Sequence, residues 1–293
     1  MLDAICTLDR SEGMTYSVFK FQKLSDDEIE HYRQFLNCPV CNGKAYYRKA
    51  SKDGKVACFG SRYHKADCRE FKPSLAKVKE EQDAIEVNQV LVDSDALVID
   101  FSILPTVAGG VKSNARKVNQ KSKTREPEPE HFNQQGTDDV ATTASGTAQD
   151  KRVSTQGLEK LLNSLLRGSE LAQSDLWVYT DEKYRWRAKN LFVNFADAEP
   201  TDNGAPRMYW GTVSHSDKEM QWLNPTDCQD VGIPIDEFQQ AIFKKFTIED
   251  RRDIEGAGVI MFGKCFWNKG KTHKIIQLWG KDVSRIFISK AED

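Results

Sequence analysis

The chain lacks the long apolar segment that a membrane-spanning helix requires. No hydrophobic run approaches about 18 residues, and the first residues show neither the basic n-region nor the apolar h-region of a signal peptide. A strong net charge is also missing, because 42 basic residues face 44 acidic ones and leave a net charge of -2. This balance excludes a uniformly basic nucleic-acid coat but hides regional charge. The sequence predicts a cytoplasmic protein without a membrane partner.

Motifs for small-molecule catalysis are missing as well. There is neither a Walker-type glycine loop nor a dinucleotide fingerprint, so no nucleotide cofactor is implied. His215 and His273 have no nucleophile or carboxylate partner at a recognisable spacing. Cys228 stands among acidic residues and Cys265 within an apolar run, which disfavours nucleophilic roles for both. We expect no catalytic residue and no small-molecule substrate.

Large apolar residues are almost absent from 112–153, which is rich in Lys, Gln, Ser, Thr, Glu and Pro. Such a segment cannot bury enough surface to offset the conformational entropy of its chain. We therefore expect a disordered linker at 112–153. The 293 residues are long for one ordinary domain, so a folded region is expected on each side of the linker.

The N-terminal region carries helix and hairpin signals around a group of cysteines. Ser25 and Glu28 fit a capping box, and apolar residues then recur at helical spacing up to Leu36. A β-hairpin is expected from 44–50 and 55–59 around a Ser-Lys-Asp-Gly turn. A charged helix is expected at 74–89, followed by one or two strands at 90–104.

Four of the seven cysteines lie between residues 38 and 68, which indicates reduced thiols around a metal rather than a disulfide framework. The first pair, Cys38-x2-Cys41, has the spacing of a zinc knuckle. The hairpin would return the chain so that Cys58 joins the pair, and Cys68 would complete a tetrahedral Zn²⁺ site. His64 also binds zinc readily and is the alternative fourth ligand.

Residues 37–69 resemble the C-terminal zinc ribbons of bacterial type IA DNA topoisomerases. The likeness rests on CPVCNG at 38–43, GKVACFGSRY at 54–63 and Cys68. It implies a zinc-dependent module that binds single-stranded DNA, and no strand-cleavage activity, because none of that family's catalytic machinery is recognisable here. The gap before Cys68 is longer than that family usually shows and contains His64, which leaves the fourth ligand open.

After residue 153 the sequence alternates between strand-like runs and turn signals. The spacing of Leu158, Leu161 and Leu165 predicts a helix that Ser154 caps and Gly168 ends. Another helix is expected at 235–246, and strand-like runs lie at 176–179, 184–195, 207–213, 220–223, 258–267, 274–279 and 284–288.

These patterns predict an α+β fold. We expect a zinc-ribbon domain with flanking helices and short strands at 1–111, the linker at 112–153, and a β-rich domain with one or two helices at 154–293. A small barrel or a strongly curved sheet fits the C-terminal domain, and an OB-like barrel is one candidate.

Regional charge indicates nucleic acid as the partner. Between Lys44 and Lys72, nine basic residues face three acidic ones, with aromatic side chains interleaved. Exposed aromatics and cations together hold single strands without sequence preference. The alternative is that the aromatics only cover the metal. The candidate contacts in this region are Tyr46, Arg48, Lys49, Lys52, Lys55, Phe59, Arg62 and Tyr63.

A second basic face is predicted at 183–189, where cations alternate with Tyr184, Trp186 and Ala188. On a strand, alternate residues share one face, which could follow a phosphate backbone or simply be solvated. The candidate contacts here are Lys183, Arg185, Arg187 and Lys189. Lysines, His273, Trp267 and Trp279 repeat the mixture near the C-terminus.

The sequence therefore predicts a bacterial accessory protein that is not an enzyme and binds single-stranded or partly unpaired DNA, or RNA. One alternative is a protein-interaction adaptor with a purely structural zinc ribbon, docking a protein partner through the Leu158–Leu166 stripe or the C-terminal tryptophans. A second alternative is a metal-dependent nuclease that uses Asp93, Asp95 and Asp100.

Overall fold

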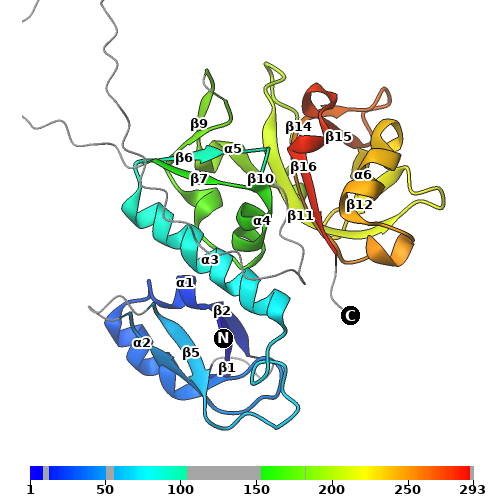
Figure 1. The fold of residues 1–293 in the computed structure, drawn as a ribbon. Coiled ribbons are helices and arrows are strands. Elements are labelled where there is room, and N and C mark those ends of the chain that lie inside the picture. Colours follow the sequence, from blue (N-terminus) through cyan, green and yellow to red (C-terminus); the bar gives the residue numbers. More distant parts are fainter. Residues whose placement is uncertain (9–12, 51–55, 104–152, 182, 291–293) are drawn as a thin grey trace, which may run out of the picture. The chain divides into compact units, whose positions relative to one another are not determined.

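The computed structural model describes residues 1–8, 13–50, 56–103, 153–181 and 183–290, and their fold is mixed α and β (Figure 1). The predicted linker lies outside these residues apart from its last position, so its disorder stays a prediction. No helix in the described ranges has both the length and the apolar character needed to cross a bilayer.

The N-terminal region contains two small sheets. In the first, β1 (Asp3–Cys6) pairs antiparallel with β2 (Met14–Ser17) and β3 (Leu36–Asn37). In the second, β4 (Ala45–Arg48) pairs with β5 (Cys58–Ser61), which confirms the predicted hairpin. The helices of this region are α1 (Val18–Phe21) and α2 (Asp26–Tyr32).

Helix α2 begins where the sequence predicts. The Ser25 hydroxyl accepts the amide of Glu28, and the Glu28 carboxylate accepts the amide of Ser25, so both amides at the helix start are paired. The core beside it is aromatic: the rings of Phe21 and Phe59 lie 5.3 Å apart, and the ring of Tyr47 is within 5.7 Å of both.

Helix α3 (Leu75–Asp93) is longer than predicted, because it includes the residues expected to start a strand at 90. The strand β6 (Ala96–Ile99) starts after it. On either side of the undescribed segment the chain forms one sheet, since β6 lies parallel to both β7 (Val153–Gln156) and β8 (Trp177–Tyr179). The sheet ends with β9 (Arg185–Arg187), antiparallel to β8. The two predicted folded regions thus share a sheet.

Helix α4 (Leu158–Leu166) carries the predicted leucine stripe. Its N-cap is Gly157 rather than Ser154, because Ser154 belongs to β7. Gly168 follows the helix with φ of +72°, a left-handed conformation that suits glycine and ends a helix. Every leucine of the stripe except Leu166 is buried in the core, so the stripe is not a free docking face for a partner.

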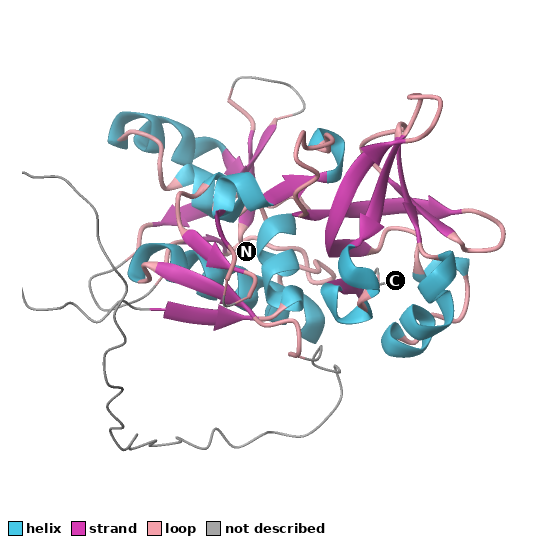
Figure 2. Cartoon of the chain, turned by 90° about the horizontal axis from the view of Figure 1, so that it is seen from above, coloured by secondary structure: helices cyan, strands magenta, loops and turns pink. Residues whose placement is uncertain are grey.

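A closed barrel forms the C-terminal part, as Figure 2 shows at right. The strands run around it in the order β11 (Arg207–Ser216), β12 (Trp222–Pro225), β13 (Val231–Pro234), β15 (Lys274–Leu278) and β14 (Gly258–Trp267), and β14 pairs back onto β11. All these pairs are antiparallel except β13 with β15. This confirms the prediction of a small barrel.

Further elements extend the barrel or connect its strands. Strand β10 (Phe192–Asn194) pairs with β11, and β16 (Ile286–Ser289) pairs with β14. Helix α5 (Ala188–Leu191) precedes β10, and α6 (Gln239–Phe246) connects β13 to β14. Short 3₁₀ helices occupy Arg33–Phe35, Leu171–Gln173, Phe195–Asp197, Asp236–Phe238, Arg251–Asp253, Trp279–Lys281 and Val283–Arg285.

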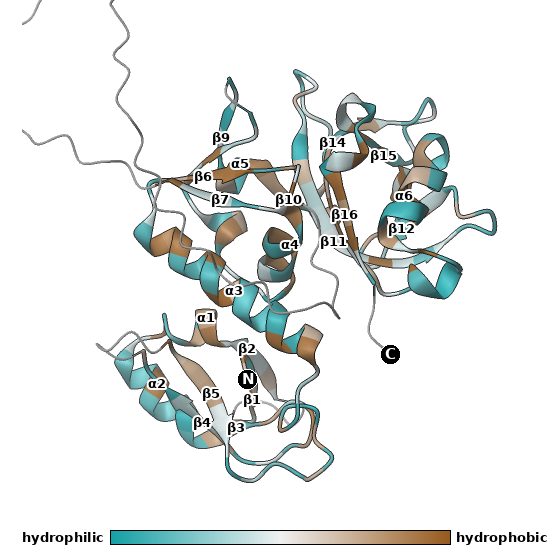
Figure 3. Ribbon diagram, viewed as in Figure 1, coloured by the Kyte–Doolittle hydropathy of each residue, from teal (hydrophilic) through white to brown (hydrophobic). Residues whose placement is uncertain are grey.

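Strand β14 contributes buried apolar side chains to the barrel. Its side chains are buried along most of its length, and Figure 3 colours it as hydrophobic. One face of the strand fills the barrel, and α4 covers its start, where Leu162 and Leu166 lie against Gly258. A strand buried on both faces needs a continuous apolar run, which the sequence at 258–263 supplies.

Candidate metal centre and candidate binding faces

The first two cysteines lie in a tight knuckle that follows β3. The amide of Cys38 donates to the carbonyl of Gly43 at 2.8 Å, and the amide of Asn42 donates to the carbonyl of Cys38 at 2.9 Å. Asn42 adopts φ of +56°, a left-handed conformation that asparagine tolerates. The turn brings the sulfurs of Cys38 and Cys41 within 4.8 Å of each other.

The register of the hairpin determines which residues meet the knuckle. Ala45 pairs with Ser61, so the chain that leaves β5 passes directly beside the knuckle. The Tyr63 carbonyl comes so close to Gly43 that a β-carbon there would overlap it. His64 follows, with its Nδ1 at 3.4 Å from the sulfur of Cys41.

Cys68 completes the group. Its sulfur lies 3.4 Å from His64 Nδ1 and 3.8 Å from the Cys38 sulfur. Cys38, Cys41 and Cys68 are buried, and His64 is half-buried. The four ligand atoms all lie within 4.8 Å of one another, so a single metal ion can reach every one of them. Four protein ligands leave a tetrahedral ion no open position, which is typical of a structural site.

Cys58 does not belong to this group, contrary to the expected ligand set. It pairs with Arg48 at the far end of the β4–β5 hairpin, three strand residues away from Ser61. Each strand residue advances the chain by about 3.3 Å, so Cys58 lies on the order of 10 Å from the end that meets the knuckle. His64 and Cys68, expected as alternatives for one position, are both members.

The pKa values of two cysteines in the site shift in opposite directions. Burial raises the pKa of the Cys38 thiol, whereas the hydrogen bond with His64 lowers the pKa of the Cys41 thiol. Metal ligation requires thiolates, so a cation that binds here displaces a proton from Cys38.

The predicted contacts in the ribbon are of three kinds: exposed residues, a buried residue, and residues that the structure does not describe. Tyr46, Arg48, Arg62 and Tyr63 are exposed, with 46% of Tyr46 and 70% of Tyr63 accessible to solvent. Lys49 is also exposed, and its ammonium lies 2.5 Å from the carboxylate of Asp26.

Phe59 is 1% exposed within the aromatic core, so the prediction that it contacts nucleic acid does not fit this structure. The burial pattern of β5 explains this, because Phe59 points to the covered side of its hairpin. Lys52 and Lys55 lie outside the described residues.

The predicted basic face at 183–189 holds only over β9. The guanidinium groups of Arg185 and Arg187 both lie over the ring of Trp177, at 4.4 and 3.8 Å from its centre. Lys183 lies in the turn before β9, and Lys189 lies on α5, where it forms an ion pair with Asp175 at 2.7 Å. Alternation stops at Ala188 because helix α5 begins there.

A polar pocket of about 340 Å³ lies on the outer face of the barrel and was not predicted. Trp222 on β12 forms one wall, with its ring packed on Gly232 of β13 and 37% of the residue exposed. Asn224 and Gln229 add amide groups, and His273 closes the pocket from the β14–β15 turn. Its lining residues come from β12, β13, β15 and the loops that join these strands, so no local sequence pattern marks it.

The β14–β15 turn is both rigid and basic. The Asn268 side-chain oxygen accepts the amides of Thr272 and His273, which fixes the turn. From residue 256 to residue 281 the chain has five lysines and no acidic residue. Two of these lysines have carboxylate partners, Lys274 and Lys281. Within the described part of the chain, no carboxylate lies within 4.0 Å of the ammonium groups of Lys264, Lys269 and Lys271.

The aspartates considered for nuclease chemistry do not form a metal group. Asp93 accepts a hydrogen bond from Gln89, and Asp100 accepts two from Ser102. Among the residues that the structure describes, the Cys₃His cluster is the group able to hold a metal ion.

Comparison with protein-family models, curated proteins and solved structures finds no match to this chain.

Proposed function

We propose that this protein binds single-stranded nucleic acid, with DNA as its preferred form, on the outer face of a barrel of the OB type. In OB-type barrels, five strands close in the order first, second, third, fifth, fourth, and the face of the second and third strands binds oligonucleotides with the first–second and fourth–fifth loops. The order β11-β12-β13-β15-β14 has this pattern, with α6 between the third and fourth strands.

The observation that carries the proposal is the location of the Trp222 pocket. It lies on β12 and β13, the second and third strands, beside the β14–β15 turn, which is the fourth–fifth loop. The aromatic ring and the amide groups therefore lie on the face that the topology favours for oligonucleotides, next to the basic β14–β15 turn.

The chemistry of this face suits a single strand. Stacking of one base on an exposed aromatic ring contributes about 1–3 kcal/mol, and Trp222 offers such a ring. Lys269 and Lys271 lie in the β14–β15 turn between Asn268 and His273, which line the pocket, and they offer cations for phosphate. Each neutralised phosphate makes binding more sensitive to salt. The amides of Asn224 and Gln229 can donate to and accept from base edges.

The metal centre fits Zn²⁺ in a structural role. Zinc bonds of about 2.3 Å to sulfur and about 2.0 Å to nitrogen in a tetrahedron place two sulfurs about 3.8 Å apart and a sulfur and a nitrogen about 3.5 Å apart. The separations of 3.8 Å and 3.4 Å agree with these values. We propose this module as a second contact for the same strand. The resemblance to topoisomerase ribbons and the exposure of Tyr46, Arg62 and Tyr63 support this part of the proposal.

Fluorescence anisotropy of a labelled single-stranded DNA across a salt series tests the proposal. The Lys269→Ala, Lys271→Ala double variant should bind more weakly and reduce the salt slope by about 1–1.5, since each phosphate contact contributes about 0.7 to the slope. The Lys244→Ala, Arg252→Ala variant is the matched control, because it removes two exposed positive charges from outside the face.

The control variant should retain wild-type affinity and slope. The proposal fails if wild-type protein does not bind DNA or RNA at low salt, and a protein partner would then be the better hypothesis. Equal losses in both double variants would also contradict the barrel face, because they would reflect net charge alone.

A further inference from the structure

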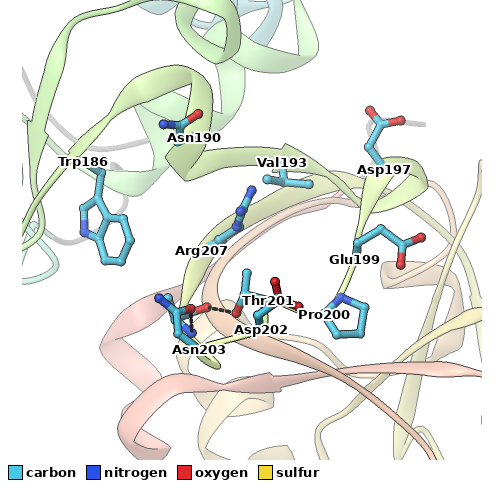
Figure 4. A pocket seen from close by; sticks show the side chains of 11 residues that line it. Trp186, Asn190, Val193, Asp197, Glu199, Pro200, Thr201, Asp202, Asn203 and Arg207 are labelled. Atoms are coloured by element: carbon cyan, nitrogen blue, oxygen red, sulfur yellow. Dashed lines mark hydrogen bonds between the residues drawn. The ribbon is translucent and has the colours of Figure 1, made fainter.

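A second and larger pocket, of about 670 Å³, lies beside the first strand of the barrel (Figure 4). Trp186 from β9 and Asn190 from α5 line one side, and the loop at 199–203 lines another. Arg207, the first residue of β11, points into the space between them in Figure 4. Its volume is within the range of about 300–1,000 Å³ that is usual for pockets that bind small ligands.

Arg207 is a half-buried cation without a carboxylate partner. Among the described residues, no carboxylate oxygen lies within 4.0 Å of its guanidinium group. Arginines that are taken partly out of water normally gain a hydrogen-bond acceptor, because burial of an unpaired charge is unfavourable. The orientation of Arg207 toward the pocket therefore points to a ligand that brings acceptors.

The ring of Trp186 is fixed in the pocket wall, where a planar ligand can stack on it. Its indole nitrogen donates to the hydroxyl of Thr180 at 3.3 Å, which fixes the ring against rotation. The ring is half-buried, with one part in the core and the other lining the pocket. A planar ligand is the natural complement of a fixed ring in a pocket wall.

The loop opposite is rigid and acidic. The Asn203 side chain accepts the amide of Ala205 at 3.0 Å, and the Thr201 hydroxyl donates to the carbonyl of the same residue at 3.0 Å. Asp197 and Asp202 line the pocket without an ion-pair partner within 4.0 Å in the described chain. These carboxylates disfavour a phosphate inside the pocket and favour a neutral group that donates hydrogen bonds.

We propose that this pocket binds an unpaired guanine base. Guanine presents two acceptors, O6 and N7, which match the paired donors of Arg207. It presents donors at N1 and N2, which match a carboxylate such as Asp202. Its flat bicyclic ring matches Trp186. Adenine has an amino donor where guanine has the O6 acceptor, so this donor would face the donors of Arg207 and could not accept a hydrogen bond from them.

The guanine pocket adjoins the proposed strand-binding face. Lys274 lines the Trp222 pocket, and its ammonium lies 2.6 Å from the carboxylate of Glu199, which lines the guanine pocket. A strand that crosses the barrel face could therefore place one base in this pocket. Binding of a guanine that belongs to a strand rests on the proposed function. Binding of a free guanine nucleotide would use the same contacts and does not depend on the proposed function.

Two labelled oligonucleotides test whether the pocket binds a guanine that is part of a strand. We would compare dT15 with the same strand carrying one central guanine. The guanine should raise affinity about tenfold, as one bidentate base contact can. Arg207→Gln should remove this increase and leave dT15 affinity unchanged. Trp222→Leu should weaken both oligonucleotides by the same factor, since Trp222 belongs to the general face.

Base analogues identify which guanine atoms the pocket recognises. Replacing the guanine with 7-deazaguanine removes the N7 acceptor, and replacing it with inosine removes the N2 donors, so each should lose part of the increase. Adenine or cytosine at the same place should give no increase. Equal affinity for all these strands, with dT15 still bound, would overturn the guanine pocket and leave the proposed function standing.

A titration with free guanosine monophosphate separates the two sources of guanine. Isothermal titration calorimetry of the full chain should show binding that Arg207→Gln abolishes and that adenosine monophosphate does not reproduce. If no oligonucleotide binds but guanosine monophosphate does, the pocket holds a free nucleotide and the proposed function is wrong. If neither the guanine-containing strand nor the nucleotide binds better than its adenine counterpart, the inference is wrong.

Discussion

The carbonyl oxygen of Tyr63 lies against the α-carbon of Gly43, at a place where the β-carbon of any other residue would overlap it. This contact holds the chain after β5 beside the cysteine knuckle, and His64 is the next residue.

Gly43→Ala should therefore displace His64 and weaken the metal site. We expect lower zinc content after dialysis and a loss of about 1–3 kcal/mol in the free energy of unfolding. Gly270→Ala is the control, because a β-carbon at Gly270 meets no atom closer than 3.8 Å. Normal zinc content in Gly43→Ala would show that the close approach does not matter.

The ligand set gives a second prediction. His64→Ala and Cys68→Ser should each lower metal affinity strongly, because each removes one of four ligands. Cys58→Ser should keep one zinc ion per chain, since Cys58 lies on the hairpin opposite Arg48. Inductively coupled plasma mass spectrometry of the purified variants measures this directly. A Cys58→Ser variant without zinc would contradict the Cys₃His site.

The metal site could be predicted from the sequence only in part. The Cys-x2-Cys spacing identifies Cys38 and Cys41, because a tight turn brings nearby residues together. The other ligands depend on the register of the hairpin, and a shift of three residues decides between Cys58 and Ser61 at the end that meets the knuckle. Neither the spacing nor the turn signal fixes that register.

Helix α4 gives a third prediction. Leu162→Ala should reduce the free energy of unfolding by about 2–5 kcal/mol, because it opens a cavity at a side chain that is fully buried. Leu166→Ala, at the partly exposed end of the same helix, should cost much less. Chemical denaturation of both variants tests this. Equal stability of both variants and wild type would restore the stripe as a candidate docking surface.

Asp253 gives a prediction about pH. Hydrogen bonds from the amide of Glu249 and from Lys290 lower the pKa of Asp253 below its ordinary value of 3.8. A lowered pKa in the folded state means that the contribution of Asp253 to stability is complete above the ordinary value. It is lost as the pH falls through the lowered value.

Asp253→Asn should therefore have a lower melting temperature than wild type at pH 7. The difference should shrink as the pH falls below about 4, where the wild-type carboxyl becomes protonated. Thermal unfolding followed by circular dichroism across this range measures the effect. A constant difference at every pH would show that the charge of Asp253 is not involved.

The barrel could be predicted as a class, but the two pockets at its surface could not. Runs such as 258–267 and 274–279 show their strand character in their own residues, and the structure places β14 and β15 there. The pockets combine residues far apart in the chain, such as Trp186 with Arg207 and Trp222 with His273. Their proximity follows from strand order, which local patterns do not encode.

Photocrosslinking tests the central claim most directly. A dT oligonucleotide with one 5-iododeoxyuridine, which crosslinks to aromatic side chains that it contacts, would be irradiated with the full chain and the crosslinked peptides identified by mass spectrometry. We predict crosslinks at Trp222 or His273 that excess unlabelled strand suppresses and that Trp222→Leu weakens. Crosslinks confined to residues outside β12, β13 and the β14–β15 turn, or none at low salt, would contradict the proposed binding face.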